Sequence, residues 1–241
     1  MNGIDEKEAI RRHIWSLMME RGVARFPLPV YNRIPNFIGA EDAARRLIGI
    51  NEYISAETIK VNPDSPQKPV REYVLRDGKT LIMPTPRIKK GFILIKPEWV
   101  KGRESYAATI KGAFKYGRLI GLDEIPFIDF IVEGSVAVSY DCGRLGKGEG
   151  YAELEYAILR EVDRVDDDVK IATTIHPIQL VASLPQDMFD VPVDIICMPN
   201  RVLRPKCRRS RPRGIYWEYI DDEKMQSIPI LRELRDRSIR K

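Results

Sequence analysis

The sequence is poor in the residues on which many catalytic and metal centres depend. It has two histidines, His13 and His176, and three cysteines, Cys142, Cys197 and Cys207, with no CxxC pair. Zinc sites of the Cys/His kind and Ser-His-Asp triads are therefore poorly supplied. The odd number and wide spacing of the cysteines argue against a disulfide framework and favour a reducing cytosol.

Long apolar runs are also missing. A membrane helix needs roughly 18 apolar residues, and the longest stretch, residues 125–138, is interrupted by Asp129, Glu133 and Ser135. The N-terminus, MNGIDEKEAI, is acidic where a secretory signal would be basic and then apolar. We therefore expect a soluble, cytoplasmic protein with no membrane partner.

The excess of positive charge is local. The 241 residues include 40 Lys and Arg against 35 Asp and Glu, which gives a net charge of +5. Seven of the basic residues and no acidic one form a segment that we call the basic run: Arg201, Arg204, Lys206, Arg208, Arg209, Arg211 and Arg213. Without it, 33 basic residues face 35 acidic ones, a balance of −2. The run is either a solvated loop or a site for an anionic ligand, which would relieve its self-repulsion.

Short apolar runs alternate with helical patterns along the chain, which predicts an α/β protein. The expected strands are residues 80–83, 92–95, 128–132, 169–175 and 193–198. Helical spacing covers residues 6–20 (with Asp5 as a cap), 41–53, 106–120, 151–162 and 229–240. Proline-rich residues 26–37 and 62–69 are expected loops. Apolar strands separated by helices favour a three-layer fold, a mainly parallel sheet with helices on both faces, in one domain with a basic C-terminal extension from about residue 201.

The sharpest motif is RLGKGEGY, residues 144–151, between an expected strand and an expected helix. Gly146, Gly148 and Gly150 let backbone amides face one concavity at a helix N-terminus, which suits phosphate oxygens. Arg144 and Lys147 add positive charge at the rim; a merely flexible turn is the alternative interpretation. The motif is not a dinucleotide fingerprint, because a tyrosine stands at the third glycine position. The GKT at 78–80 lacks the earlier glycine of a Walker loop.

Charged side chains elsewhere complement this motif. Lys7 and Arg11 are four residues apart, so they share one helix face, where they clamp a polyphosphate or simply meet solvent. Glu153 and Glu155 follow the glycines, and two aspartates lie in FDVPVD, residues 189–194. Mg²⁺ binds through one or two carboxylates together with phosphate oxygens. For Glu153, a favourable interaction with the helix dipole is an equally good explanation.

Taken together, these blocks resemble the 5-formyltetrahydrofolate cyclo-ligases, also called methenyltetrahydrofolate synthetases. They are most similar to a divergent branch, the methenyltetrahydrofolate synthase domain-containing proteins. The family's first-helix Lys/Arg pattern is KEAIR at 7–11, and its loop R-[LI]-G-x-G-x-G-Y-Y-D is RLGKGEGYAE at 144–153. A later family block is matched within 179–194, and the branch adds RIPNF at 33–37 and GIYW at 214–217.

The resemblance implies a fold like that of the ribose-5-phosphate isomerase and CoA-transferase (NagB/RpiA-like) group. It implies closure of 5-formyltetrahydrofolate to 5,10-methenyltetrahydrofolate, with a reduced folate as substrate and ATP and Mg²⁺ as cofactors. In that reaction the formyl oxygen attacks the γ-phosphate, and nitrogen 10 then displaces phosphate. Because the substrate supplies both nucleophiles, the protein needs only to position the reactants and neutralise charge.

Carried over residue by residue, the resemblance implies three sets of site residues. The ATP-binding set is Lys7, Arg11, Arg144, Gly146, Lys147, Gly148, Glu149, Gly150 and Tyr151, with Lys147 and Arg144 as the catalytic pair. The implied metal ligands are Glu153 and Asp190, and the implied substrate contacts are Asp64, Tyr151 and Gln179. The chain departs from the family at Glu153, where an aspartate is usual, and at Ala152, where a second tyrosine is usual. The family's folate-side glutamate has no clear counterpart, and Asp64 is the nearest acid.

A second hypothesis is a divergent nucleotide-binding module without folate activity that binds RNA through the basic run. RNA-binding surfaces often pair cations with stacking aromatic residues, and Tyr216, Trp217 and Tyr219 follow the run. The segment IYWEYI, residues 215–220, is also typical of a terminal strand whose aromatic side chains pack inward. The sequence is compatible with a monomer or a small homo-oligomer.

Overall fold

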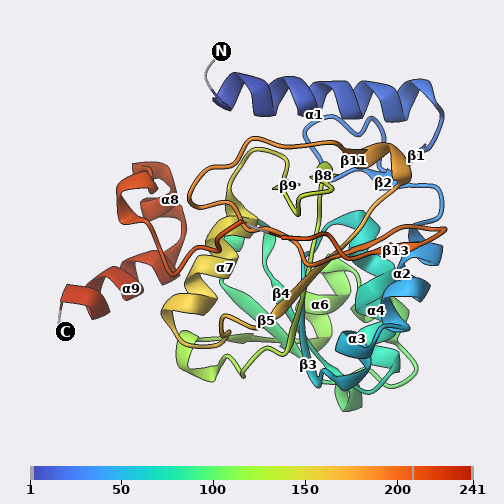
Figure 1. Ribbon diagram of the computed structural model, residues 1–241. Coiled ribbons are helices and arrows are strands. Elements are labelled where there is room, and N and C mark those ends of the chain that lie inside the picture. The colour runs from blue at the N-terminus through green and yellow to red at the C-terminus, as the bar shows by residue number, and fades with distance from the viewer. Residues whose placement is uncertain (1–2, 208, 240–241) are drawn as a thin grey trace.

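The computed structural model describes residues 3–207 and 209–239 (Figure 1). The α-helices are α1 (Gly3–Glu20), α2 (Ala40–Ile48), α3 (Asn51–Ser55), α4 (Lys68–Arg76), α5 (Glu104–Ala107), α6 (Ile110–Tyr116), α7 (Tyr151–Glu161), α8 (Asp222–Ser227) and α9 (Pro229–Ile239). The strands are β1 (Ala24–Arg25), β2 (Asn36–Phe37), β3 (Thr58–Val61), β4 (Thr80–Pro84), β5 (Phe92–Ile95), β6 (Arg118–Ile120), β7 (Phe130–Glu133), β8 (Ala137–Ser139), β9 (Arg144–Leu145), β10 (Lys170–Thr174), β11 (Leu180–Val181), β12 (Ile195–Cys197) and β13 (Val202–Leu203).

A central eight-stranded sheet has the order β13-β12-β10-β7-β3-β4-β5-β6. The five strands from β12 to β4 are parallel, whereas the pairs β12–β13, β4–β5 and β5–β6 are antiparallel. A smaller three-stranded sheet has the order β11-β8-β9, and β1 pairs with β2. The α/β fold class and the mainly parallel sheet expected from the sequence are confirmed.

Both faces of the central sheet are covered by helices because successive strand residues point to opposite sides. On one face Ile131 and Ile171 pack in a core that also contains residues of α7 and α9. On the other face their neighbours Val132 and Ala172 pack with residues of α2, α4 and α6. The strands are therefore apolar throughout, as the sequence pattern indicated.

A third apolar cluster joins α1 to the small sheet. Ile14, Trp15 and Met18 of α1 are buried against Ala137 of β8 and Leu145 of β9. Figure 1 shows α1 (blue) running across the side of the molecule that carries β8, β9 and β11. The arrangement holds the first helix over RLGKGEGY, residues 144–151, which begins with β9 and which we call the glycine motif.

The prediction of one continuous helix at 106–120 is wrong. The segment forms two short helices, α5 and α6, and then the edge strand β6. Thr109 starts α6 by accepting a hydrogen bond from the Gly112 N–H (2.9 Å). The chain turns at Gly117, where a Cβ atom would lie 2.4 Å from Ile93 Cγ2 of β5. The close approach of two strands thus decides the end of the helix, and local periodicity does not show it.

Other boundaries also differ from the sequence prediction. The expected helix 41–53 is divided at Gly49 into α2 and α3, and Asp5 lies inside α1 and does not precede it. Lys68 begins α4 within the expected loop 62–69, and β3 and α8 were not predicted. The sequence IYWEYI is no strand: residues Trp217–Tyr219 form a 3₁₀ turn and Tyr219 is 55% exposed. The sheet edge beside β12 is already occupied by β13.

The cysteines also differ from expectation. Cys142 and Cys207 form a disulfide with their Cα atoms 5.1 Å apart, and Cys197 is buried and free. The two bonded cysteines are separated by 65 residues, so sequence spacing gave no sign that the turn after β8 meets the basic run. Within the described part of the chain, no helix has the length and apolar character needed to cross a membrane.

Candidate functional site

A cleft of about 710 Å³ opens where the parallel strands β3 and β7 reach their carboxyl ends. This edge is where open α/β sheets commonly bind ligands. The cleft, which we call the main cleft, is lined by α1, by the loops after β3 and β4, by the glycine motif and by residues 187–190. All predicted site residues except Gln179 lie among its lining residues.

The glycine motif forms the wall of this cleft in the conformation that glycine favours. Gly148 and Gly150 have φ values of +102° and +72°, and Gly150 leads directly into α7. A Cβ atom at Gly148 would lie 3.2 Å from Arg11 Cζ, so α1 and the loop approach closely. Arg11 Nε donates to the Gly146 carbonyl (2.9 Å). The two sequence-distant blocks, KEAIR and RLGKGEGY, are therefore brought together.

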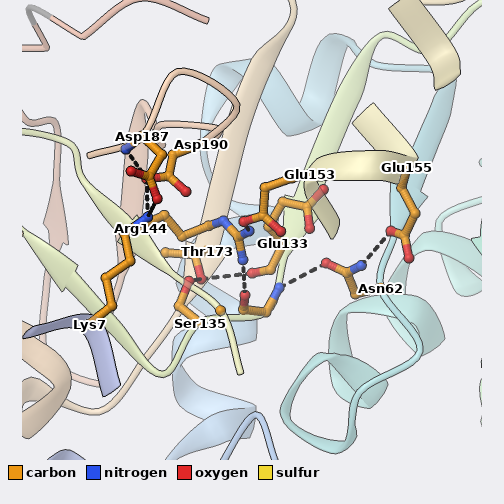
Figure 2. Close-up of polar contacts among 12 residues, drawn as sticks. Lys7, Asn62, Glu133, Ser135, Arg144, Glu153, Glu155, Thr173, Asp187 and Asp190 are labelled. Atoms are coloured by element: carbon orange, nitrogen blue, oxygen red, sulfur yellow. Dashed lines mark hydrogen bonds and ion pairs between the residues drawn. The ribbon is translucent and has the colours of Figure 1, made fainter. Parts of the chain in front are cut away.

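Lys7 reaches into the cleft beside two acids. Its Nζ lies 2.7 Å from Asp187 Oδ2 and 2.5 Å from Asp190 Oδ2, and the lysine side chain is 9% exposed. Figure 2 shows these two carboxylates next to each other above Lys7. Burial raises the pKa of Asp190, although the bond to Lys7 opposes the rise. An incoming anion would have to share Lys7 with this pair.

Arg144 lies beneath the loop and is almost completely buried. Its Nη1 donates to the Gly134 carbonyl (2.7 Å), and its Nη2 donates to Glu153 at the start of α7. Burial lowers the pKa of Arg144, but Glu153 and the other nearby carboxylates outweigh this effect and the net pKa is raised. Arg144 therefore stays charged and holds the turn after β7 against the first turn of α7.

Lys147 is the more accessible of the two predicted catalytic cations. Its Nζ lies 2.7 Å from Glu149 Oε2, and its side chain is 32% exposed. Glu149 also bonds to Arg87 from the loop after β4 (3.0 Å). These three residues all line the main cleft, so the rim of the glycine motif is a charged network that spans two loops.

A buried cluster of ionisable residues, which the sequence did not reveal, adjoins the cleft. Lys60 of β3 is fully buried and lies 2.6 Å from Glu133 Oε1 and 2.5 Å from Glu155 Oε2. Asn62 Nδ2 donates to the same oxygen of Glu155 (2.7 Å), a contact visible in Figure 2. Burial raises the pKa of Glu155 to about 7. Only Asn62 and Glu155 of this cluster face the cleft.

Asp64 marks the side of the cleft that the sequence assigned to the substrate. Burial raises the pKa of its carboxyl group, while Lys147 and Arg71 oppose the rise. Arg71 Nη1 donates to the carbonyl oxygens of Asn62 and Asp64 (3.0 Å to the latter), which fixes the loop after β3. Burial lowers the pKa of Arg71 to about 10.

Gln179 does not lie in the cleft. Its side chain is fully buried, and its Nε2 donates to the carbonyls of Ser135 (2.8 Å) and Val136 (3.2 Å). Its Oε1 accepts from the His176 N–H (2.8 Å). With these bonds made, Gln179 supports the turn between β7 and β8, and its predicted contact with substrate is not among those that the main cleft brings together.

Several members of the basic run are paired with acids from elsewhere in the chain. Arg204 contacts Glu52 through two bonds (2.5 and 2.9 Å). Arg209 bonds to Asp141 and Arg211 to Asp194, each at 2.5 Å. Arg208 lies outside the described residues. The run therefore has part of its self-repulsion offset within the fold, and none of its described residues lines the main cleft.

The donor chemistry of the cleft fits MgATP. The glycine motif, which carries Lys147, lies against Arg11, and Glu153 and Asp190 offer oxygen ligands in the same cleft. Among the described residues no group of three or more His, Cys, Asp or Glu could hold a metal ion alone. A divalent cation here would therefore need ligand oxygens from a nucleotide, as is usual for Mg²⁺. Four further residues that were not predicted from the sequence also line the cleft: Asp187, Asn62, Arg87 and Phe189. Of these, Asp187 was the easiest to infer, because it lies three residues before Asp190.

The fold and the site together define an α/β protein with a charged ligand cleft at the carboxyl edge of its sheet, where a glycine-rich loop leads into a helix N-terminus. The sequence matches the profile of the 5-formyltetrahydrofolate cyclo-ligase family over residues 4–199. The chain belongs to this family, as the sequence motifs indicated.

Individual relatives agree with this placement. The chain is 42% identical over 235 residues to the methenyltetrahydrofolate synthase domain-containing protein of Bos taurus, covering 95% of this chain and 62% of that protein. It is 40% identical over 237 residues to the protein of the same description from Homo sapiens, covering 96% of this chain and 62% of the relative. The chain thus spans less than two thirds of the length of these relatives. The NMR structure of Aquifex aeolicus 5,10-methenyltetrahydrofolate synthetase has 18% identity and a TM-score of 0.52, covering 89% of this chain and 99% of that one, which supports the fold.

Proposed function

We propose that this protein catalyses the ATP-dependent cyclisation of 5-formyltetrahydrofolate to 5,10-methenyltetrahydrofolate. The observation that carries the proposal is the convergence of Arg11 from α1 and Lys147 from the glycine motif on one cleft. Family membership supports the reaction class. The cleft volume of about 710 Å³ lies within the usual range for small-molecule sites.

The reaction requires little covalent chemistry from the protein. The formyl oxygen of the folate attacks the γ-phosphorus and ADP leaves. Nitrogen 10 then attacks the formyl carbon, and the C–O bond breaks to release phosphate, which takes up the proton lost from nitrogen 10. Arg11 and Lys147 face the cleft, where they would neutralise phosphate charge, and Arg144 would position the loop through Gly134 and Glu153. Such preorganised charges act in a site that is partly shielded from water, where they are strongest.

Glu153 and Asp190 are the residues that would hold Mg²⁺. The ion would supply further charge neutralisation at the phosphates. In the structure these carboxylates bond to Arg144 and Lys7, respectively. Lys7 would pair with phosphate oxygens and so release Asp190 for the metal, whereas Arg144 would keep its bonds to Gly134 and to one oxygen of Glu153. Asp64 and Tyr151, which line the cleft, remain our proposed folate contacts.

The experiment is an absorbance assay for methenyltetrahydrofolate with and without MgATP. We expect product only when ATP is present, and we expect Lys147→Ala to reduce the rate at least tenfold, since one electrostatic contact to the transition state is typically worth that much or more. Lys101→Ala removes an exposed lysine outside the cleft and serves as the matched control. Absence of product from the folded parent protein, with ATP and Mg²⁺ present, would contradict the proposed reaction.

A further inference from the structure

A second pocket, about 240 Å³, adjoins the main cleft at the glycine motif. We call it the side pocket. Five residues line both cavities: Gly148, Glu149, Gly150, Glu153 and Phe189. The two cavities therefore meet along the glycine motif, and one ligand can occupy both.

The side pocket differs from the main cleft in charge. Lys7, Arg11 and Lys147 line only the main cleft. Among the residues that line the side pocket the one cation is Lys224, whose Nζ is bonded to Asp221 (2.5 Å). Much of the remaining wall is apolar or aromatic, including Leu154 and Ala157 of α7. A ligand that spans both cavities would thus place its anionic part in the main cleft and an uncharged part in the side pocket.

Residues 212–224 build the outer wall of the side pocket. Pro212, Ile215, Tyr216, Tyr219 and Ile220 all line it. The Tyr219 ring lies 5.4 Å from that of Phe189, which comes from the segment that also carries Asp190. Figure 1 shows the segment leading into α8 and α9 (red) beside α7 (yellow). Half-exposed Tyr219 offers an aromatic face at the rim of the pocket.

This wall is fixed to the rest of the fold. Arg211 Nη1 donates to the Val169 carbonyl (2.6 Å), and the Ile215 N–H donates to Glu161 Oε2 of α7 (3.3 Å). Ile215 is also buried in the apolar core on this face of the sheet. The side pocket is therefore preformed, which reduces the entropy lost on binding.

We propose that the side pocket binds the base of the nucleotide whose phosphates bind at the glycine motif. A cavity of about 240 Å³ is smaller than a typical complete ligand site, and it suits one planar ring system. Aromatic side chains bind bases through their π faces with little dependence on sequence. The proposal rests on the proposed function, because it requires phosphates in the main cleft.

The wall is a feature of this chain beyond the family profile. The profile matches residues 4–199, and the outer wall consists of residues 212–224. The glycine motif and α1 therefore supply the phosphate site from within the family region. The segment after it supplies the surface that holds the base.

The test compares ATP with inorganic tripolyphosphate, which has the charge but no base, by calorimetric titration in the presence of Mg²⁺. We expect Tyr219→Ala to weaken ATP binding about fivefold or more, in line with the loss of one base-stacking contact. Ala157→Leu fills the pocket from α7 and should act in the same direction. Neither change should alter the affinity for tripolyphosphate or for 5-formyltetrahydrofolate. Tyr106→Ala, which removes a half-exposed tyrosine from another aromatic pair, is the matched control.

The remaining outcomes would contradict either the base site alone or the base site together with the phosphate site. Unchanged ATP affinity in Tyr219→Ala, or an equal loss for ATP and tripolyphosphate, removes the base site but leaves the phosphate site standing. A selective loss of folate affinity assigns the pocket to the folate ring and contradicts our proposal. If the parent protein binds neither ATP nor tripolyphosphate, the proposed function fails and the base site fails with it.

Discussion

Arg11 and Arg12 are adjacent on α1, but Arg11 faces the main cleft and Arg12 faces solvent. The Arg11 side chain is 11% exposed and lines the main cleft, whereas that of Arg12 is 75% exposed. Loss of a charge-assisted phosphate contact costs roughly 1.5–3 kcal/mol. We therefore predict that Arg11→Ala weakens ATP binding at least about tenfold, while Arg12→Ala changes it less than about twofold. Equal effects of the two changes in calorimetric titrations would exclude a phosphate contact for Arg11.

Lys7→Ala tests the other member of the predicted clamp. Removing Lys7 leaves Asp187 and Asp190 without their shared cation beside the phosphate site. Repulsion between these carboxylates and ATP then adds to the lost attraction, so ATP affinity should fall at least about tenfold. Titration with ATP measures the effect, and an unchanged affinity in the folded variant would rule out the clamp.

Glu155 gives the protein a predictable pH dependence. Burial raises the pKa of its carboxyl group from 4.5 to about 7. The native state therefore holds a proton that the unfolded chain has released, and stability must fall as pH rises from about 4.5 to 7. Glu155→Gln removes this contribution, so its unfolding free energy should vary less over that range than that of the parent. Urea unfolding at several pH values measures the slope. Glu98→Gln, at an exposed side chain, should keep the parent slope.

The candidate site was only partly predictable from the sequence, for a physical reason. The glycine motif and the Lys7–Arg11 pair are short continuous segments, so their patterns can be recognised in the sequence alone. The Lys60–Glu133 pair comes from β3 and β7, which are neighbours only after the sheet forms. Gln179 matched a family block, but its side chain points into the protein. A match in sequence does not show whether a side chain faces the cleft or the interior.

In the glycine motif the backbone conformation and the closeness of α1 can be tested separately. Gly148 and Gly78 both have positive φ (+102° and +74°), so alanine at either position costs about 1–2 kcal/mol of stability. At Gly148 the new Cβ would also lie 3.2 Å from Arg11 Cζ, whereas at Gly78 nothing lies within 4 Å. We predict that both variants unfold at lower urea concentration but that only Gly148→Ala weakens ATP binding. Normal ATP binding by Gly148→Ala would show that Arg11 and the loop are not coupled.

Among the secondary elements, those with a strong local signal were predicted and those that depend on packing were not. The segments Phe92–Ile95 and Tyr151–Glu161 are uniformly apolar or clearly periodic and were assigned closely. Thr58–Val61 was missed because Lys60 interrupts its apolar character, although that lysine is fully buried with two glutamates. The aromatic segment 215–220 has strand composition, but its residues Trp217–Tyr219 form a 3₁₀ turn and the segment lines a pocket instead.

The basic run shows how a local charge excess is distributed over the whole molecule. Arg204, Arg209 and Arg211 each contact an acid far away in the sequence. These pairs reduce the repulsion that an anionic ligand would otherwise relieve. Binding of RNA through the run remains a prediction that filter binding over a salt series can test, because phosphate contacts make affinity fall steeply with salt. A salt-independent or absent signal would leave the run with a structural role.

Arg211 is the residue on which that structural role depends most. Its Nη2 lies 2.5 Å from Asp194 Oδ2, the same oxygen that accepts from the Ile171 N–H of β10, and its Nη1 donates to Val169. These bonds attach the C-terminal segment to the central sheet at β10 and β12. Hydrogen bonds to charged groups are worth about 1.5–3 kcal/mol, so Arg211→Ala should lower the free energy of unfolding by about that amount.

Arg213, two residues further along, provides the comparison. Its side chain is exposed, and exposed surface substitutions usually change stability by less than about 0.5 kcal/mol. Both variants remove one positive charge from the same run, so a general electrostatic effect would move them equally. We predict that urea unfolding separates them by more than about 1 kcal/mol, with Arg211→Ala the less stable. If the two unfolding curves coincide, the segment is not attached through Arg211, and the preformed wall of the side pocket must depend on other contacts.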